Sequence, residues 1–154
     1  MAYAVTSLPA EPFAPLFSMD DETLAAHGAR RVVADVARGF PCRVSLDDAA
    51  PGETLILVNY EHQPAPTPFR ASHAVFVREN VEPVATVDEM PPALRRRLLA
   101  LRAFDADGMM LAADIVEGAQ ADALIAKLFE DEKIAYLHAH YAKWGCYAAR
   151  IDRA

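Results

Sequence analysis

The sequence is short of several residue types, and each shortage excludes a class of protein. Two of its 154 residues are cysteines, too few for a disulfide framework. The six glycines form neither a phosphate-binding loop nor a dinucleotide-binding turn. No apolar run approaches the roughly 18 residues of a membrane span, and no basic region of a signal peptide opens the chain. We therefore expect a cytoplasmic protein that does not act at a membrane.

Positive charge is also scarce. Acidic residues number 22 against 15 basic ones, so the formal net charge is −7, which disfavours nucleic acid as a partner. Only three of the basic residues are lysines, and arginine is the better side chain for binding carboxylate or phosphate. The remaining composition is 53% hydrophobic and 24% charged, as in globular proteins, and we expect a single domain over residues 1–154.

The pattern of apolar residues predicts more strands than helices. Two apolar runs, residues 98–104 and 109–116, flank the Asp107-Gly108 turn and predict a hairpin. We expect further strands at residues 3–8, 30–36, 42–46, 53–60, 72–78, 84–87, 134–141 and 146–151, and helices at residues 18–27, 91–97 and 119–130. Short turns join many neighbouring strands. The predicted fold class is therefore α+β, a largely antiparallel sheet with two or three packed helices.

A pair of histidines lies two residues apart in a predicted strand. Because side chains alternate along a strand, His138 and His140 point to the same face. This arrangement occurs in metal sites built on β-structure, and His73, at the start of another strand, is the candidate third ligand. One hypothesis is therefore a metal-dependent enzyme that uses this His-x-His pair. The alternative is that the histidines hydrogen-bond to carboxylates or backbone groups.

Arginines in and beside predicted strands suggest an anion site. Arg43, Arg70 and Arg150 are the candidates to hold a carboxylate or phosphate, and Arg102 stands in an otherwise apolar strand. His73, His138 and His140 are the candidate catalytic residues, because an ordinary imidazole pKa of about 6.5 suits proton transfer. Our leading hypothesis is a binding protein or enzyme for a small anionic metabolite with an Arg/His-lined pocket. Ordinary salt bridges are the alternative, and the sequence leaves open whether the protein is an enzyme and which cofactor it uses.

The polar segment at residues 59–63 leads into a loop with three prolines. Tyr60 and Glu61 from this segment are further candidate ligand-binding residues, since proline rigidity would hold the rim of a site in place. An ordinary edge loop explains the same pattern.

Two other functions stay open. Cys146 follows a glycine and stands near the histidine pair, so it is a candidate nucleophile, although both Cys42 and Cys146 suit inert buried positions. A non-catalytic interaction or assembly module is the other alternative. Trp144 with Tyr141 and Tyr147 would form its aromatic anchor, and homo-oligomer formation through edge strands would be one outcome.

Several longer segments resemble a known family. They are Gly-Phe-Pro-Cys-Arg at residues 39–43, Asn-Tyr-Glu-His-Gln at 59–63, Phe-Arg-Ala-Ser-His-Ala-Val-Phe-Val-Arg-Glu at 69–79, Arg-Ala-Phe-Asp-Ala-Asp-Gly at 102–108, Leu-His-Ala-His at 137–140 and Gly-Cys-Tyr-Ala-Ala-Arg at 145–150. In these segments the chain is similar to an uncharacterised bacterial family catalogued as domain of unknown function 1203. The resemblance spans nearly the whole chain. It implies a small, stand-alone cytoplasmic bacterial protein and brings no activity or catalytic residues with it.

Overall fold

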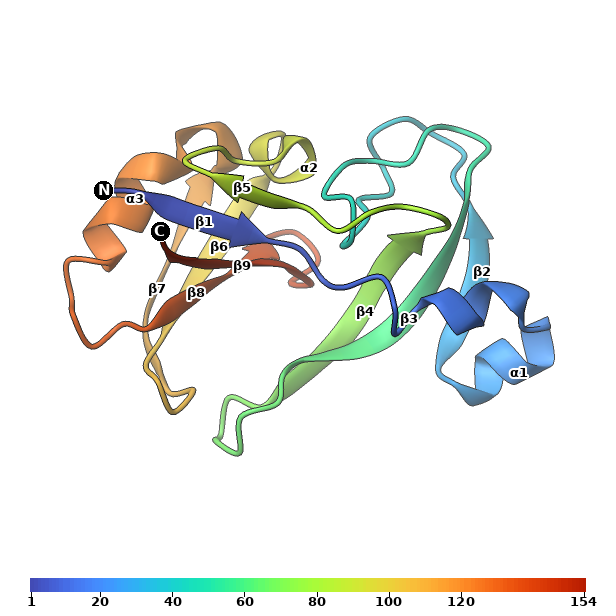
Figure 1. Cartoon of the computed structure of the whole chain (residues 1–154), viewed down its shortest axis with the longest axis horizontal. Helices are drawn as coiled ribbons and strands as arrows, with labels where there is room; N and C mark the ends of the chain where they lie inside the picture. Colours follow the sequence, from blue (N-terminus) through green and yellow to red (C-terminus); the bar gives the residue numbers. More distant parts are fainter.

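The computed structural model describes all 154 residues as two antiparallel sheets with short helices packed against them (Figure 1). Six strands form the larger sheet in the order β5-β1-β9-β8-β6-β7, and three form the smaller in the order β2-β3-β4. The strands are β1 (Tyr3–Thr6), β2 (Ala29–Val33), β3 (Thr54–Gln63), β4 (Ala71–Arg78), β5 (Ala85–Val87), β6 (Leu98–Phe104), β7 (Met110–Glu117), β8 (Tyr136–Tyr141) and β9 (Tyr147–Arg153). The helices are α1 (Asp21–Ala26), α2 (Pro92–Arg95) and α3 (Ala121–Leu128), with 3-10 turns η1 (Ala14–Ser18) and η2 (Gly118–Gln120). The predicted α+β class is confirmed, although the strands form two sheets. None of the helices is long and apolar enough to cross a membrane.

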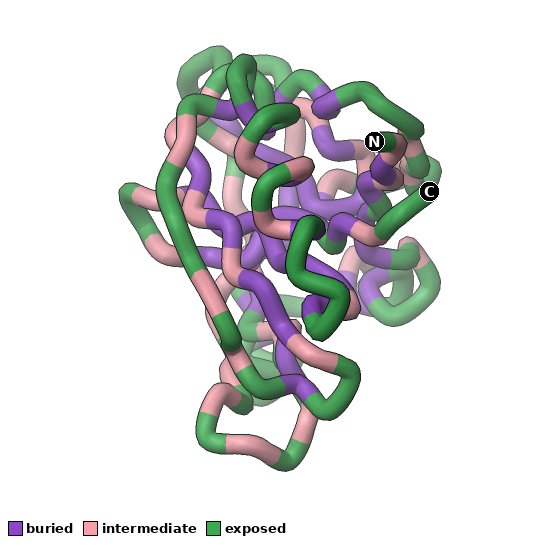
Figure 2. Tube along the Cα trace, turned by 90° about the vertical axis from the view of Figure 1, so that its left-hand side faces the viewer, coloured by how far each residue is buried: buried purple, intermediate pink, exposed green.

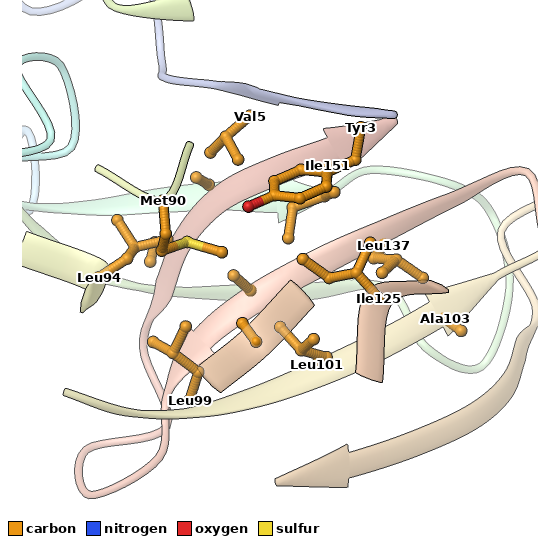
Figure 3. Packing of buried hydrophobic residues seen from close by; sticks show 14 of the residues in the cluster. Tyr3, Val5, Met90, Leu94, Leu99, Leu101, Ala103, Ile125, Leu137 and Ile151 are labelled. Atoms are coloured by element: carbon orange, nitrogen blue, oxygen red, sulfur yellow. The ribbon is translucent and has the colours of Figure 1, made fainter. Parts of the chain in front are cut away.

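One face of the six-stranded sheet is closed by α3. Leu99 and Leu101 of β6 and Leu137 of β8 form one buried cluster with Ile125 of α3 (Figure 3). All four side chains are fully buried. Burial of each such side chain contributes roughly 1.5–3 kcal/mol. This apolar layer is therefore the main hydrophobic core of the molecule.

The three-stranded sheet has a smaller core of its own. Ile56 and Val58 of β3 share a buried cluster with Leu24 of α1. Helix α1 begins at Asp20, whose carboxylate accepts a hydrogen bond from the backbone N–H of Thr23 at 2.8 Å. The predicted start of this helix at Ser18 is wrong by two residues, because Asp20 supplies the N-cap acceptor.

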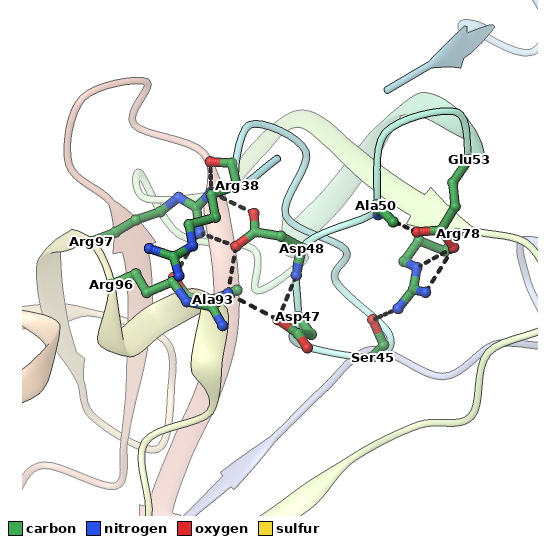
Figure 4. Close-up of polar contacts among 10 residues, drawn as sticks. All are labelled: Arg38, Ser45, Asp47, Asp48, Ala50, Glu53, Arg78, Ala93, Arg96 and Arg97. Carbon is green, nitrogen blue, oxygen red and sulfur yellow. Dashed lines mark hydrogen bonds and ion pairs between the residues drawn. The ribbon is translucent and has the colours of Figure 1, made fainter. Parts of the chain in front are cut away.

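The connection between the sheets is fastened by ion pairs. Asp48 contacts both Arg96 and Arg97, at 2.9 and 2.6 Å, and Asp47 contacts Arg96 at 3.0 Å (Figure 4). The Asp48 and Arg97 side chains are 5% and 20% exposed, so their contact is better shielded from water than an ordinary surface pair, whereas the Asp47–Arg96 contact is exposed. They hold the loop before β3 against α2, on the edge of the larger core.

One predicted strand is absent and another is longer than predicted, and both differences affect the candidate site. Residues 42–46 form a turn, since the N–H of Leu46 donates to the carbonyl of Cys42 and Leu46 has a φ of 53°. Strand β3 continues to Gln63 after an irregularity in its pairing with β4 past Tyr60. Residues 61–63, expected in a loop, therefore extend towards the larger sheet.

Strand β8 lies between two covered faces. All six of its residues are buried, and buried positions run along the strands while the turns are exposed (Figure 2). Leu137, Ala139 and Tyr141 of β8 belong to the cluster on the α3 face. Tyr136, His138 and His140 lie on the other face, near the end of β3. The second of these two faces carries the candidate site.

Candidate functional site

A row of polar side chains crosses the face of the six-stranded sheet that lies away from α3. His138 of β8 pairs with Arg102 of β6 on one side and with Arg150 of β9 on the other. Side chains of directly opposed residues point to the same face of a sheet. The register therefore places one imidazole between two arginines, and His140 lies two residues further along the same face.

The third imidazole of this face comes from the other sheet. The centroid of the His62 ring lies 5.0 Å from that of His140 and 6.2 Å from that of His138. The same ring stacks on Tyr147 with a centroid distance of 5.3 Å. His62 was not among the predicted site residues, although Tyr60 and Glu61 were, because the strand was expected to end before residue 61 and its alternation was not continued to His62. A signal for His62 was present in the sequence. Tyr60 and His62 alternate with the charged Glu61, as side chains on one face of a continuing strand would.

A pocket of about 570 Å³ opens beside these rings. It is lined by His62, Gln63, Pro64, Ala65, Ala106, Ala135, Tyr136, His138 and Arg150. The buried amide of Gln63 donates to the Tyr136 hydroxyl at 3.0 Å, so a hydrogen bond between the two sheets forms part of its wall.

Two turns meet at the mouth of the pocket. The Thr67 hydroxyl donates to the carbonyl of Gly108 at 3.0 Å, and the ends of the two hairpins lie together at the bottom of Figure 1. Gly108 has a φ of 87°, and a Cβ there would lie 2.4 Å from the Cβ of Ala65. Only glycine fits this close approach, which keeps the proline loop against the β6–β7 turn.

The three imidazoles are neutral at physiological pH. Burial lowers the pKa of His62 to about 4 and the pKa values of His138 and His140 to about 3. The positive charge of Arg102 lowers all three further. The Nδ1 atoms of His62 and His138 and the Nε2 atom of His140 are buried without a hydrogen-bond partner. Such unpartnered polar atoms are rare in protein interiors and mark a site that a ligand or water completes.

The two arginines of the row have different partners. Arg150 donates to both carboxylate oxygens of Asp152 at 2.8–3.0 Å, and its guanidinium lies 4.1 Å from the centroid of the Tyr136 ring. Arg102 is half-buried and has neither a hydrogen bond nor an ion pair within the chain. Burial without a partner lowers the Arg102 pKa from its usual value. Arg102 therefore presents an uncompensated positive charge on this face.

Comparison with known proteins identifies the family. Residues 39–153 match the family described as "Protein of unknown function (DUF1203)". The chain belongs to the DUF1203 family. The match includes every residue that lines the pocket, and it confirms the resemblance found in the sequence. No curated protein and no solved structure matches the chain.

Arg43 of this DUF1203 chain does not face the pocket. Its side chain is 1% exposed and donates to the carbonyls of Tyr147 at 2.7 Å and Pro41 at 2.5 Å, and to the sulfur of Cys146 at 2.9 Å. Its guanidinium also lies 4.8 Å from the centroid of the Tyr141 ring. The proposed convergence of Arg43 with the histidines is therefore wrong, because its donors are used in joining β9 to the turn before β3.

Arg70, Glu61, Tyr60 and His73 also lie outside the pocket lining. Arg70 is exposed and pairs with Glu61 at 3.0 Å across the β3–β4 hairpin. Tyr60 is half-buried against Phe13, with ring centroids 5.6 Å apart, and burial raises its pKa. His73 is paired with Tyr60 in the ladder. Of the eight predicted site residues, the structure brings only His138, His140 and Arg150 together.

The same geometry bears on the other hypotheses. No three His, Cys, Asp or Glu side chains are grouped as metal ligands, and the imidazole beside the pair is His62 instead of His73. Cys42 and Cys146 are both buried and unbridged, and neither lines the pocket.

The predicted aromatic anchor is incomplete. Tyr141 and Tyr147 are buried, which leaves Trp144 as its one exposed ring, in the turn between β8 and β9. The pocket face therefore has several polar and charged side chains that could bind a ligand, whereas this turn has one exposed aromatic ring.

Proposed function

We propose that this DUF1203 protein binds a small anionic metabolite in the pocket between its two sheets. The observation that carries the proposal is Arg102, a half-buried guanidinium without a partner, in one row with His138 and Arg150. A charge held out of water without a partner costs free energy that a bound carboxylate or phosphate would recover.

The charges on this face favour an anion over a metal ion. No Asp or Glu lines the pocket. The nearby carboxylate of Asp152 already pairs with Arg150. The imidazoles are neutral and the Asp152 carboxylate offsets the charge of Arg150, so Arg102 sets the sign of the local field. A cation at this position would be repelled by Arg102.

Binding can be tested with one pair of variants. Phosphate, sulfate and simple carboxylates would be screened by thermal unfolding at constant ionic strength. A ligand at a hundredfold excess over its Kd raises the unfolding free energy by about 2.7 kcal/mol. We expect Arg102→Gln to weaken anion binding at least about tenfold, in line with loss of a charge-assisted hydrogen bond. The free Arg102→Gln protein should keep the wild-type stability or exceed it, because an unpaired charge is removed.

The matched control is Arg30→Gln. Arg30 is exposed on β2 in the other sheet and has no partner, so its loss changes the net charge equally. Equal loss of binding in both variants would reduce the effect to overall charge, and a screen in which no anion stabilises the wild type would refute the proposal.

The free cysteines bear on the cellular compartment of the protein. Both cysteines are free, as expected in a reducing compartment. We retain the cytoplasm of a bacterium as the proposed location, with a soluble anionic ligand as the partner.

A further inference from the structure

The orientation of one buried amide in the pocket wall follows from its two neighbours. Gln63 is 2% exposed, and its side-chain oxygen accepts a hydrogen bond from the backbone N–H of Ala65 at 3.3 Å. A backbone N–H can only donate, so the atom that faces it is the oxygen of the amide. The amide nitrogen therefore faces the Tyr136 hydroxyl, to which it donates at 3.0 Å.

This hydrogen bond leaves the hydrogen of the Tyr136 hydroxyl without an acceptor. An amide NH2 group can only donate, so the phenolic oxygen accepts from Gln63 and its own hydrogen needs a different partner. The hydroxyl takes part in no other hydrogen bond within the chain. Tyr136 is buried and lines the pocket, so a ligand bound there can supply the missing acceptor.

The ring of Tyr136 lies against a neighbour that carries a second free donor. The Arg150 guanidinium is 4.1 Å from the centroid of the ring. Its Nε and Nη2 atoms donate to Asp152, whereas its Nη1 atom makes no hydrogen bond. Tyr136 and Arg150 both line the pocket, and a hydroxyl and a charged N–H both suit the oxygens of an anion.

Part of the remaining lining is apolar. The proline loop, the β6–β7 turn and the residue before β8 contribute Pro64, Ala65, Ala106 and Ala135. Phosphate and sulfate carry oxygens on every side, and an oxygen buried against such side chains loses its hydrogen bonds to water without compensation. A small monocarboxylate has its oxygens at one end and hydrocarbon at the other, so it fits both parts of the lining.

We propose that the Tyr136 hydroxyl is a specificity-determining donor of the pocket, that Gln63 positions it, and that the ligand is a small monocarboxylate with a short hydrocarbon body. The hydroxyl donates to a carboxylate oxygen beside Arg150, and the hydrocarbon body packs against the apolar part of the lining. Arg102 supplies the positive field. The inference rests on the proposed anion site and names its ligand class.

The ligand class is tested with three probes on the full-length wild-type protein. Propionate, phosphate and sulfate are compared by thermal unfolding at pH 7.5 and constant ionic strength. We expect propionate to bind at least about tenfold more tightly than either inorganic anion. Phosphate or sulfate binding as tightly as propionate would overturn the ligand class and leave the anion site intact. No stabilisation by any of the three would refute the proposed function, and the inference with it.

The hydroxyl is tested by Tyr136→Phe, with Tyr60→Phe as the matched control. Both variants remove one phenolic hydroxyl, but Tyr60 lies outside the pocket lining. We expect Tyr136→Phe to weaken propionate binding at least about tenfold, as for loss of a hydrogen bond to a charged group, and Tyr60→Phe to leave it unchanged. Unchanged affinity in a folded Tyr136→Phe protein would overturn the inference, whereas the anion site would stand if Arg102→Gln still weakened binding.

A spectroscopic measurement makes the test independent of whether that variant folds. The carbon-13 shift of a tyrosine Cζ atom changes when its hydroxyl donates a hydrogen bond to an anion. Saturating propionate should therefore move the Cζ resonance of Tyr136 in the wild type and leave that of Tyr60 in place. A Tyr136 resonance that does not move would overturn the inference.

A double-mutant cycle separates positioning by Gln63 from a purely structural role. Gln63→Glu keeps an oxygen that accepts from Ala65, but its ionised carboxylate accepts the hydrogen of the Tyr136 hydroxyl and withdraws it from the ligand. We expect Gln63→Glu to weaken propionate binding more in the wild-type background than in Tyr136→Phe, where only the added charge acts. Equal losses in the two backgrounds would show that Gln63 does not act through Tyr136 and would overturn its positioning role.

Discussion

The two faces of the six-stranded sheet differ in whether their buried side chains leave polar atoms without hydrogen-bond partners. On the α3 face, Leu101 and Leu137 are fully buried in a continuous apolar cluster. On the opposite face, His138 and His140 are as deeply buried but leave ring nitrogens without partners. Both faces are built by the same strands. The difference lies in what covers them: a helix closes one face, and the end of β3 covers the other only in part.

This contrast separates stability from function within single strands. Adjacent residues of β6, Leu101 and Arg102, point to opposite faces, so one contributes to the core and the other to the row with His138, which lines the pocket. Unsatisfied buried groups cost free energy, and proteins retain them mainly at functional sites. The site face is therefore where ligand binding should stabilise the protein most.

The largest effect is expected on the closed face. Leu101→Ala should lower the unfolding free energy by about 2–5 kcal/mol, because it leaves a cavity in the apolar layer. Urea unfolding followed by circular dichroism measures the change. Anion affinity of the folded variant should stay at the wild-type value, in contrast with Arg102→Gln. A parallel loss of affinity in Leu101→Ala would show that the two faces are not independent.

The second largest effect is expected on the pH dependence of the unfolding free energy. The pKa values of His138 and His140 are about 3 in the folded protein and about 6.5 in the unfolded chain. Between these values the unfolded chain binds more protons, so stability falls as the pH falls below about 6.5. Each ring should cost about 1–2 kcal/mol at pH 5. Urea midpoints measured from pH 7 to pH 5 would show this decline.

A pair of variants assigns the acid sensitivity to the site face. His138→Phe should flatten the decline, because the buried ring no longer has to remain unprotonated. His27→Gln is the control, since His27 lies exposed at the end of α1. A stability that stays level from pH 7 to pH 5 in the wild type would contradict the low pKa values.

Strand periodicity predicted one half of the site. The alternation in residues 136–141 placed both histidines of β8 on one face, and Arg102 was already noticeable as a charge in an apolar strand. Which strands would lie beside each other was not visible in the sequence. The row of Arg102, His138 and Arg150 depends on a strand order that places β8 between β6 and β9.

Long-range contacts explain what the sequence concealed. Arg43 stands in a polar motif, yet its guanidinium is buried and donates to the carbonyl of Tyr147 at the start of β9 and to the sulfur of Cys146 just before it, more than one hundred residues away. His62 lies within an irregularity in the pairing of β3 with β4, between Tyr60 and Gln63. The pattern of nearby residues does not predict that a strand continues past such an irregularity. Both errors concern tertiary pairing, whereas the assignment of strands and helices depended mainly on local patterns.

The smallest effect is expected at a predicted site residue that lies away from the pocket. Arg70→Gln removes one partner of an ion pair whose side chains are 62% and 42% exposed, so stability should change by about 0.2–1 kcal/mol at most. Anion affinity should not change, although the variant loses the same charge as Arg102→Gln. Thermal unfolding with and without phosphate compares the two variants directly. If Arg70→Gln weakened binding as much as Arg102→Gln, the ligand would lie at the β3–β4 hairpin, and the row across β6, β8 and β9 would not be the site.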